Sequence, residues 1–148
     1  MDPATSALLT DLYQLNMMQA YLDRGETKTA SFEFFVRKLP RERGFLIAAG
    51  LEQVLGFPAN LRFAPEELDW LARTGRFGKE LIDYLAALRF TGDIHAMPEG
   101  TVFFADEPIL RVTAPLPEAQ LVETRLINLL QFQSMIAAKA ARMVLAAP

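Results

Sequence analysis

The sequence predicts an α+β fold in which a small antiparallel sheet packs against helices. Residues 29–37 alternate between apolar and polar side chains, a pattern typical of a half-buried strand. Residues 90–113 form short runs of strand character separated by turn residues. Residues 118–146 contain no helix breaker and are rich in alanine and leucine, which favours one long helix.

Composition excludes several kinds of site. The chain has 148 residues, a length that favours one domain, and its net charge of −3 without a long basic run lacks the electrostatic footprint of nucleic-acid binding. With no cysteine and one histidine, disulfides, thiolate zinc sites and multi-histidine metal sites within the chain are excluded. The sequence also lacks a signal-peptide pattern and a long uninterrupted apolar run, which argues against a membrane span and is consistent with a cytoplasmic protein.

The first predicted helix, residues 12–23, begins among polar and aromatic side chains. Asp11 is expected to cap it by accepting backbone N–H bonds, and Gln14 to reach back to the Asp11 amide as in a capping box. Tyr13 lies in the first turn. Two interpretations stay open: an acid and a ring at a helix start can contact a flat ligand, or this is a capped start whose tyrosine packs locally. Gly25 is placed to end the helix.

The alternating strand leads into a cationic loop. Arg37 ends the strand, and Lys38, Arg41 and Arg43 follow it, so four cations lie within seven residues. Such a group can gather phosphate, because charge-assisted hydrogen bonds to phosphate favour arginine. The alternative is a solvated basic loop without a ligand.

The middle of the chain indicates packing rather than chemistry. Residues 44–50 form a short apolar run between glycines, which can be a buried strand or the start of a helix, since periodicity does not decide at this length. Helices are predicted at residues 51–57, from Pro65 onward, and at residues 79–88.

Strand character returns in three short segments. Residues 92–97, 101–104 and 109–113 are separated by tight-turn residues, which predicts an antiparallel meander. His95, the single histidine, lies in the first of these strands beside apolar neighbours and without a visible partner. We therefore expect it to be structural or on the surface.

The long helix predicted at residues 118–146 has two distinct faces. Thr124, Asn128 and Gln131 share a polar face, because they are spaced at i, i+4 and i+7. A continuous apolar stripe runs along a different face. We divide the chain into two parts. Residues 1–114 form an α+β domain, and residues 115–148 form a long helix that leads out of it.

An ordered series of segments resembles one enzyme family. The series consists of Thr10-Asp11-Leu12-Tyr13-Gln14, Phe32-Glu33-Phe34-Phe35-Val36-Arg37, Ala48-Ala49-Gly50-Leu51, Pro98-Glu99-Gly100 and Glu123-Thr124-Arg125-Leu126-Ile127-Asn128. In this order, and over essentially all 148 residues, it resembles the N-terminal part of nicotinate phosphoribosyltransferase. No single motif is decisive, but the order is specific.

The resemblance implies an enzyme that joins nicotinate to phosphoribosyl pyrophosphate, giving nicotinate mononucleotide and pyrophosphate in NAD biosynthesis. ATP hydrolysis and Mg²⁺ are implied as well, although this chain alone is expected to bind neither. It also implies a homodimer whose active site lies at the mouth of an irregular α/β barrel and is completed by the partner's N-terminal domain. Tyr13 would stack on the pyridine ring, Asp11 would lie beside it, and Arg37 would approach the sugar phosphates, with Lys38 and Arg43 as weaker candidates.

Two departures from the family pattern matter. The barrel, with the expected catalytic residues, would lie beyond Pro148. We therefore expect this chain to be a fragment that is inactive alone, or else a naturally short relative. We also expect the fragment to self-associate through the apolar stripe of its long helix, which the barrel would otherwise cover. Thr124 stands where the related quinolinate enzymes carry an arginine for an extra carboxylate, which favours a monocarboxylate substrate. Two alternatives stay open. The chain can belong to a related quinolinate or nicotinamide phosphoribosyltransferase, or it can be a non-catalytic assembly module.

Overall fold

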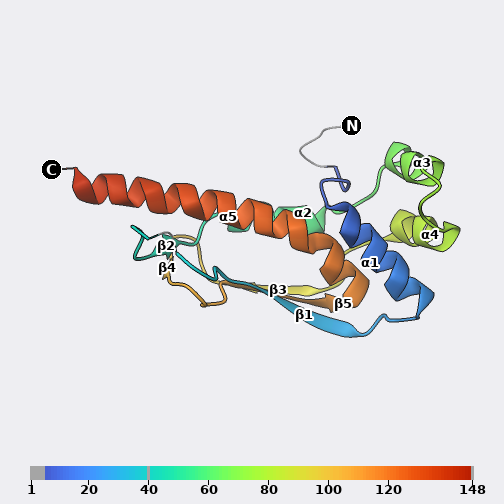
Figure 1. Ribbon diagram of the computed structural model, residues 1–148, viewed down its shortest axis with the longest axis horizontal. Coiled ribbons are helices and arrows are strands. Elements are labelled where there is room, and N and C mark those ends of the chain that lie inside the picture. The colour runs from blue at the N-terminus through green and yellow to red at the C-terminus, as the bar shows by residue number, and fades with distance from the viewer. Residues whose placement is uncertain (1–5, 40, 148) are drawn as a thin grey trace.

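A computed structural model describes residues 6–39 and 41–147 of the chain (Figure 1). It confirms the α+β class, with helices and strands close to the predicted positions. The helices are α1 (Leu12–Asp23), α2 (Leu51–Ala59), α3 (Pro65–Arg73), α4 (Lys79–Ala87) and α5 (Leu116–Ala146); the strands are β1 (Thr29–Phe34), β2 (Leu46–Ile47), β3 (Asp93–Ala96), β4 (Val102–Phe103) and β5 (Leu110–Pro115).

The main sheet has the order β1-β5-β3, and both pairs are antiparallel. Its two faces differ in polarity, as the alternating sequence predicts. On the inner face, Phe32 lies opposite Val112, and both contribute to the main core. On the outer face, Glu33 lies opposite Arg111 and accepts hydrogen bonds from its Nε and Nη2 at 2.9 and 2.6 Å. The sheet therefore buries one face and leaves the other to solvent.

The predicted meander is wrong. β3 pairs directly with β5, while β4 leaves this sheet and pairs with β2 in a separate two-stranded ladder. β4 and β2 are only two residues long, and Phe103 and Leu46 are buried together in a second core cluster. Adjacency along the chain predicted the meander, but burial of Phe103 determines the actual pairing. The same ladder resolves the open choice for residues 44–50, which contain a short strand.

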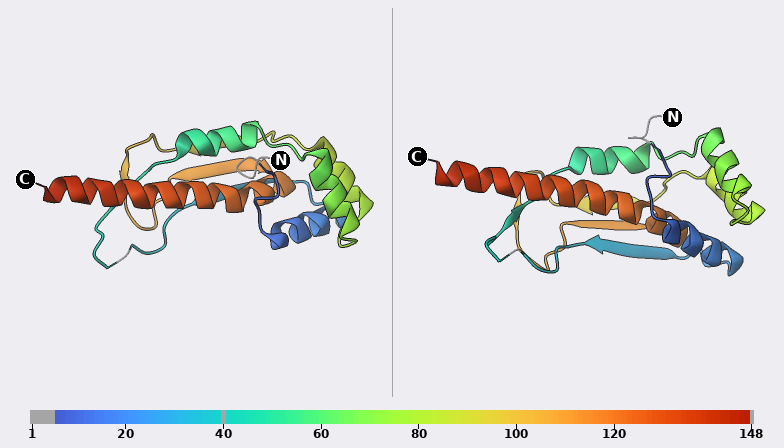
Figure 2. Two further views of the ribbon diagram at one scale, coloured as in Figure 1. Left: turned by 90° about the horizontal axis from the view of Figure 1, so that it is seen from above. Right: turned by 45° about the horizontal axis from the view of Figure 1, so that its top comes forward.

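Helix α5 runs along most of the molecule and lies over the inner face of the main sheet (Figure 1). α2 lies alongside it, and α1, α3 and α4 gather around its N-terminal end (Figure 2). The first half of α5 is fixed in the core through buried residues that include Leu121, Val122, Leu126 and Leu130. Among the described residues, no helix combines the length and apolar character needed to cross a membrane.

The segment predicted as a long helix, residues 115–148, is helical over nearly all of its described length. Pro115 is the N-cap of α5, and Ala147 follows its last residue. Pro148 falls outside the described residues. We took it as the end of this segment and expect the catalytic residues beyond it. The division of the chain at residue 115 therefore stays a prediction.

Two glycines with positive φ lie at helix boundaries. Gly25 follows α1 with a φ of +67°, as predicted for a residue that ends a helix. Gly50 precedes α2 with a φ of +105°, and its backbone N–H and that of Leu51 donate to Glu99 Oε1 at 2.8 and 2.6 Å. Glu99 therefore satisfies the free amides at the start of α2 from a distant turn.

Candidate functional site

Tyr13 and Asp11 lie at the edge of an open hollow between the start of α1 and the middle of α5. We call this the tyrosine hollow; its volume is about 670 Å³. Tyr13 keeps 46% of its surface exposed, although Gln14 and Leu15, which follow it in α1, are buried. The predicted polar face of α5 forms much of the opposite wall. The lining includes Asp11, Tyr13, Thr124, Asn128, Gln131 and Phe132.

Asp11 occupies the N-cap position of α1, but its carboxylate does not cap the helix. Its Oδ2 instead accepts a hydrogen bond of 3.0 Å from the Thr124 hydroxyl on α5. The capping prediction is therefore wrong. A local motif was expected to use this carboxylate, but a residue 113 positions away uses it instead. The consequence is that Asp11 holds the rim of the tyrosine hollow to α5.

Gln14 also departs from its predicted role. It does not reach back to the Asp11 amide but is completely buried. Its Nε2 lies 2.8 Å from Tyr13 Oη, 2.9 Å from Thr124 Oγ1 and 3.1 Å from Glu123 Oε2. Gln120 Nε2 donates to Gln14 Oε1 and, at 2.9 Å, to Glu123 Oε2. A buried polar network thus joins α1 to α5 directly behind Tyr13.

The cationic loop lies at a second hollow on the other side of this network. We call it the arginine hollow; its volume is about 580 Å³ and its lining includes Arg37, Lys38, Glu123 and Gln131. Gln131 lines both hollows, so they are neighbours on one face of α5. Arg37 lies beyond the end of β1 rather than within it, since the strand stops at Phe34.

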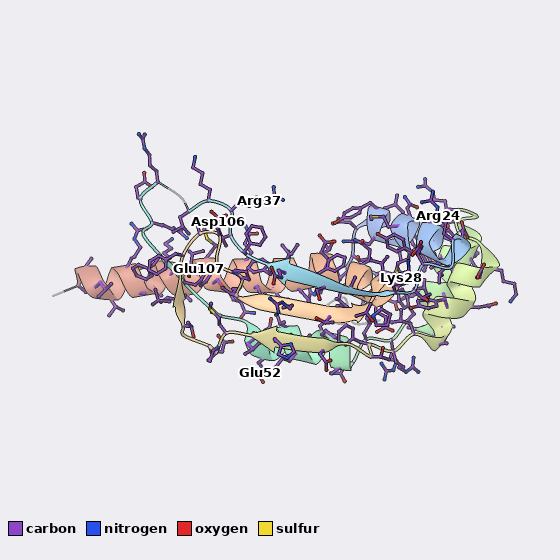
Figure 3. The ribbon with its side chains drawn as sticks, turned by 90° about the horizontal axis from the view of Figure 1, so that it is seen from below. Arg24, Lys28, Arg37, Glu52, Asp106 and Glu107 are labelled. Carbon is purple, nitrogen blue, oxygen red and sulfur yellow. The ribbon has the colours of Figure 1, made fainter. Side chains whose placement is uncertain are left out.

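The position of Arg37 is fixed by the turn that follows β4. Val36 carbonyl oxygen accepts a hydrogen bond of 2.9 Å from the Asp106 amide, so the two loops run together (Figure 3). Asp106 itself has a φ of +62°. Lys38 joins Arg37 at the arginine hollow. Arg43 lines a different hollow together with Lys139 and Arg142, and its Nη1 donates to the Sδ of Met135, which lines the arginine hollow, at 3.0 Å. The structure therefore places Arg37 and Lys38 in the lining of the arginine hollow and Arg43 behind it.

Sequence reasoning missed the importance of Gln14 and Gln120. A signal for Gln14 exists: it lies four residues before the buried Met18, so helical periodicity places it on the core face of α1. Gln120 carries no such signal, because its burial depends on α1 packing against the start of α5. Glu123 was noticed only as part of a motif, although it contacts both glutamine side chains.

His95 is exposed on β3, opposite Arg111 of β5, and lies outside both hollows. The surface assignment is therefore confirmed. Within the described part of the chain, no group of three or more histidine, aspartate or glutamate side chains is arranged to hold a metal ion. The catalytic residues that we expect beyond Pro148 stay a prediction, because both they and Pro148 itself lie outside the described residues.

Comparison with known proteins places these features in a family. The sequence profile of the nicotinate phosphoribosyltransferase (NAPRTase) N-terminal domain matches residues 8–131. The chain belongs to this family. The matched segment of the NAPRTase N-terminal domain includes Asp11, Tyr13, Arg37 and the polar face of α5, and therefore the main walls of both hollows.

Individual relatives agree with the family assignment. A nicotinate phosphoribosyltransferase of Mycobacterium tuberculosis is 49% identical over 141 residues, covering 95% of this chain and 30% of the relative. The nicotinate phosphoribosyltransferase of Bacillus subtilis is 45% identical, covering 92% of this chain and 28% of the relative. The chain therefore spans about 30% of the length of these curated relatives.

Solved structures extend the likeness to the fold. Human nicotinic acid phosphoribosyltransferase superimposes with a TM-score of 0.86 at 34% identity, over 95% of this chain and 29% of that one. Nicotinate-nucleotide pyrophosphorylase from Pyrococcus furiosus superimposes with a TM-score of 0.63 at 19% identity, over 87% of this chain and 26% of that one, and shows the fold alone.

Proposed function

We propose that this chain is the N-terminal part of an enzyme that joins nicotinate to phosphoribosyl pyrophosphate, giving nicotinate mononucleotide and pyrophosphate in NAD biosynthesis. The family match supports the reaction. The observation that carries the proposal in this chain is Tyr13: an exposed ring held from behind by a buried amide, at the rim of an open hollow. Packing alone does not require an aromatic ring in that position.

We assign two roles to the two hollows. In the tyrosine hollow, Tyr13 stacks on the pyridine ring of a nicotinate bound in the barrel of a partner subunit, with Asp11 beside it. A π-face that holds a planar nucleophile acts mainly by orientation. In the arginine hollow, Arg37, with Lys38 nearby, approaches the phosphates of the sugar substrate. Displacement of pyrophosphate builds negative charge on the leaving group, which nearby cations stabilise.

The lining of the tyrosine hollow favours a substrate with one carboxylate over quinolinate. Thr124 presents a hydroxyl there, and that hydroxyl already donates to Asp11. None of the described residues that line this hollow is a lysine or arginine, so they offer no cation to a second carboxylate. The negative charge of Asp11 opposes one as well.

Several features of the proposed enzyme rest on the resemblance. They are the homodimer with shared sites, location in the cytoplasm, and the use of Mg²⁺ and ATP. The described residues do not form a metal-binding cluster on their own, so we derive no step of this chain through Mg²⁺.

The test is a substrate panel. A full-length enzyme that carries this sequence is assayed with phosphoribosyl pyrophosphate and, separately, nicotinate, nicotinamide and quinolinate. We expect kcat/KM to be highest for nicotinate. Preference for quinolinate or nicotinamide would reassign the substrate, and turnover of none of the three would favour a non-catalytic assembly module.

A further inference from the structure

The buried network behind Tyr13 has a defined direction. Glu123 Oε2 receives the side-chain amides of both Gln14 and Gln120, at 3.1 and 2.9 Å. In both contacts the amide nitrogen is the donor and the carboxylate oxygen the acceptor, so both glutamines point their NH₂ groups at Glu123. The Tyr21 hydroxyl donates to Gln120 Oε1 at 3.0 Å, which agrees with the same orientation.

The orientation of Gln14 determines what the Tyr13 hydroxyl can do. Gln14 Oε1 is occupied by the amide of Gln120, and Gln14 Nε2 faces Tyr13 Oη at 2.8 Å. An amide nitrogen has no lone pair to offer, so the tyrosine oxygen accepts this hydrogen bond and its own proton is directed elsewhere. The two N–H bonds of Gln14 Nε2 are shared among three acceptors, Tyr13 Oη, Thr124 Oγ1 and Glu123 Oε2. The proton of the Thr124 hydroxyl goes to Asp11.

We propose that Gln14 is a positioning residue, which fixes the ring of Tyr13 through its hydroxyl and so prepares the tyrosine hollow for the pyridine ring. This inference rests on the proposed function. A half-exposed tyrosine without this bond would have several side-chain orientations available in solvent. With the bond, both ends of the ring are held, one by the backbone of α1 and the other by a completely buried amide. Gln14 itself does not line either hollow.

The inference is tested with Tyr13→Phe, Gln14→Met and the double variant, in a full-length enzyme that carries this sequence. Tyr13→Phe keeps the stacking ring and removes only the hydroxyl. We expect each single variant to raise KM for nicotinate about two- to tenfold, the range of one net hydrogen bond, with a smaller change in kcat. In the double variant, the rise in KM should be smaller than the product of the two single effects, because Gln14→Met and Tyr13→Phe share the loss of one bond, although Gln14→Met also removes bonds to Thr124, Glu123 and Gln120.

Gln19→Met is the matched control. Gln19 is a glutamine of the same helix whose side chain also bonds across the fold, accepting from the Gly78 amide at 2.9 Å, but it lies outside both hollows. We expect its KM for nicotinate to be unchanged. Thermal unfolding of all variants gives a second double-mutant cycle, based on Tm instead of KM. The falls in Tm for Tyr13→Phe and Gln14→Met should likewise be less than additive.

The outcomes separate the inference from the proposed function. An unchanged KM for Tyr13→Phe, or an equal rise for Gln14→Met with and without the tyrosine hydroxyl, would overturn the positioning role while the enzyme still turns over nicotinate. If Gln14→Met does not fold, an unchanged KM for Tyr13→Phe would still overturn the positioning role. Absence of nicotinate turnover in the unsubstituted enzyme would overturn the proposed function, and the positioning role with it.

Discussion

Tyr13 shows how a single exposed residue can be held by buried chemistry. Its ring faces the tyrosine hollow, yet its hydroxyl contacts the amide of Gln14, which has no exposed surface. The residue therefore contributes little to the core, and its substitution affects mainly what binds in the hollow.

Replacing Tyr13 with alanine tests this at the residue scale. We expect Tyr13→Ala to raise KM for nicotinate more than Tyr13→Phe does, because it removes the stacking surface as well as the hydroxyl. The free energy of unfolding should change by only about 1 kcal/mol, as for other half-exposed residues that lose one hydrogen bond. Steady-state kinetics and urea denaturation give the two values. Unchanged kinetics would leave Tyr13 as a helix-start residue only.

Tyr84 gives a pH prediction. Burial, and to a smaller extent the negative charge of Glu118, raises the pKa of the Tyr84 hydroxyl above its ordinary value. The folded chain thus holds this proton more tightly than the unfolded chain does. The stabilisation is fully present below the ordinary tyrosine pKa of about 10 and is lost as pH rises through the raised value.

We therefore expect the free energy of unfolding to fall as the pH rises above the ordinary tyrosine pKa of about 10, and to fall less steeply in Tyr84→Phe. Urea denaturation at a series of pH values measures both slopes. Parallel slopes in the two proteins would show that another group is responsible.

Residue identities were easier to predict from the sequence than their partners. Asp11, Tyr13 and Arg37 do line hollows, but the local capping motif expected for Asp11 and Gln14 does not form. Local propensity favours a cap, whereas the structure offers these side chains Thr124 and Glu123 on a helix far along the chain. Sequence spacing carries no information on such a contact.

At the scale of elements, the positions of the helices were easier to predict from the sequence than the pairing of the strands. The bounds of α1 agree with the prediction, and α5 begins two residues before it, because helical periodicity and breakers are local signals. The pairing of β4 with β2 was missed, because a two-residue strand has too little pattern to specify its neighbour.

The boundary before α2 gives an element-scale prediction. A Cβ at Gly50 would lie 2.7 Å from Gln133 Nε2 and 3.2 Å from the Leu129 carbonyl oxygen, at a φ of +105°. We expect Gly50→Ala to destabilise the fold by about 1–3 kcal/mol. Gly56→Ala, inside α2 with open space around the new Cβ, should instead stabilise it by about 0.5–1 kcal/mol. Chemical denaturation compares the two; equal effects would contradict the crowding at Gly50.

At the scale of the whole molecule, the two halves of α5 differ. The first half is buried in the core, whereas the second half extends past the main sheet (Figure 1). Ala138 in the second half is buried, but several larger apolar side chains there are exposed. Ile136 and Val144 are 52% and 73% exposed on one helix face. Contiguous exposed apolar surface of this kind favours association.

We therefore expect the 148-residue chain alone to self-associate through a second copy of this face. Sedimentation over a range of concentrations measures it. Ile136→Ser combined with Val144→Ser should weaken association, whereas Leu55→Ser, at an exposed apolar residue of α2, should not. A monomer at all concentrations would contradict the expectation.

The unbroken course of α5 also fixes how the two hollows lie relative to each other. Glu123 lines the arginine hollow and the next residue, Thr124, lines the tyrosine hollow, while Gln131 lines both. The hollows therefore lie side by side around the helix rather than one after the other along its axis. One residue inserted between Thr124 and Gln131 would turn everything beyond it by about 100° and take Gln131 out of both walls. An insertion in the loop that follows Lys38 would leave this stretch of α5 intact.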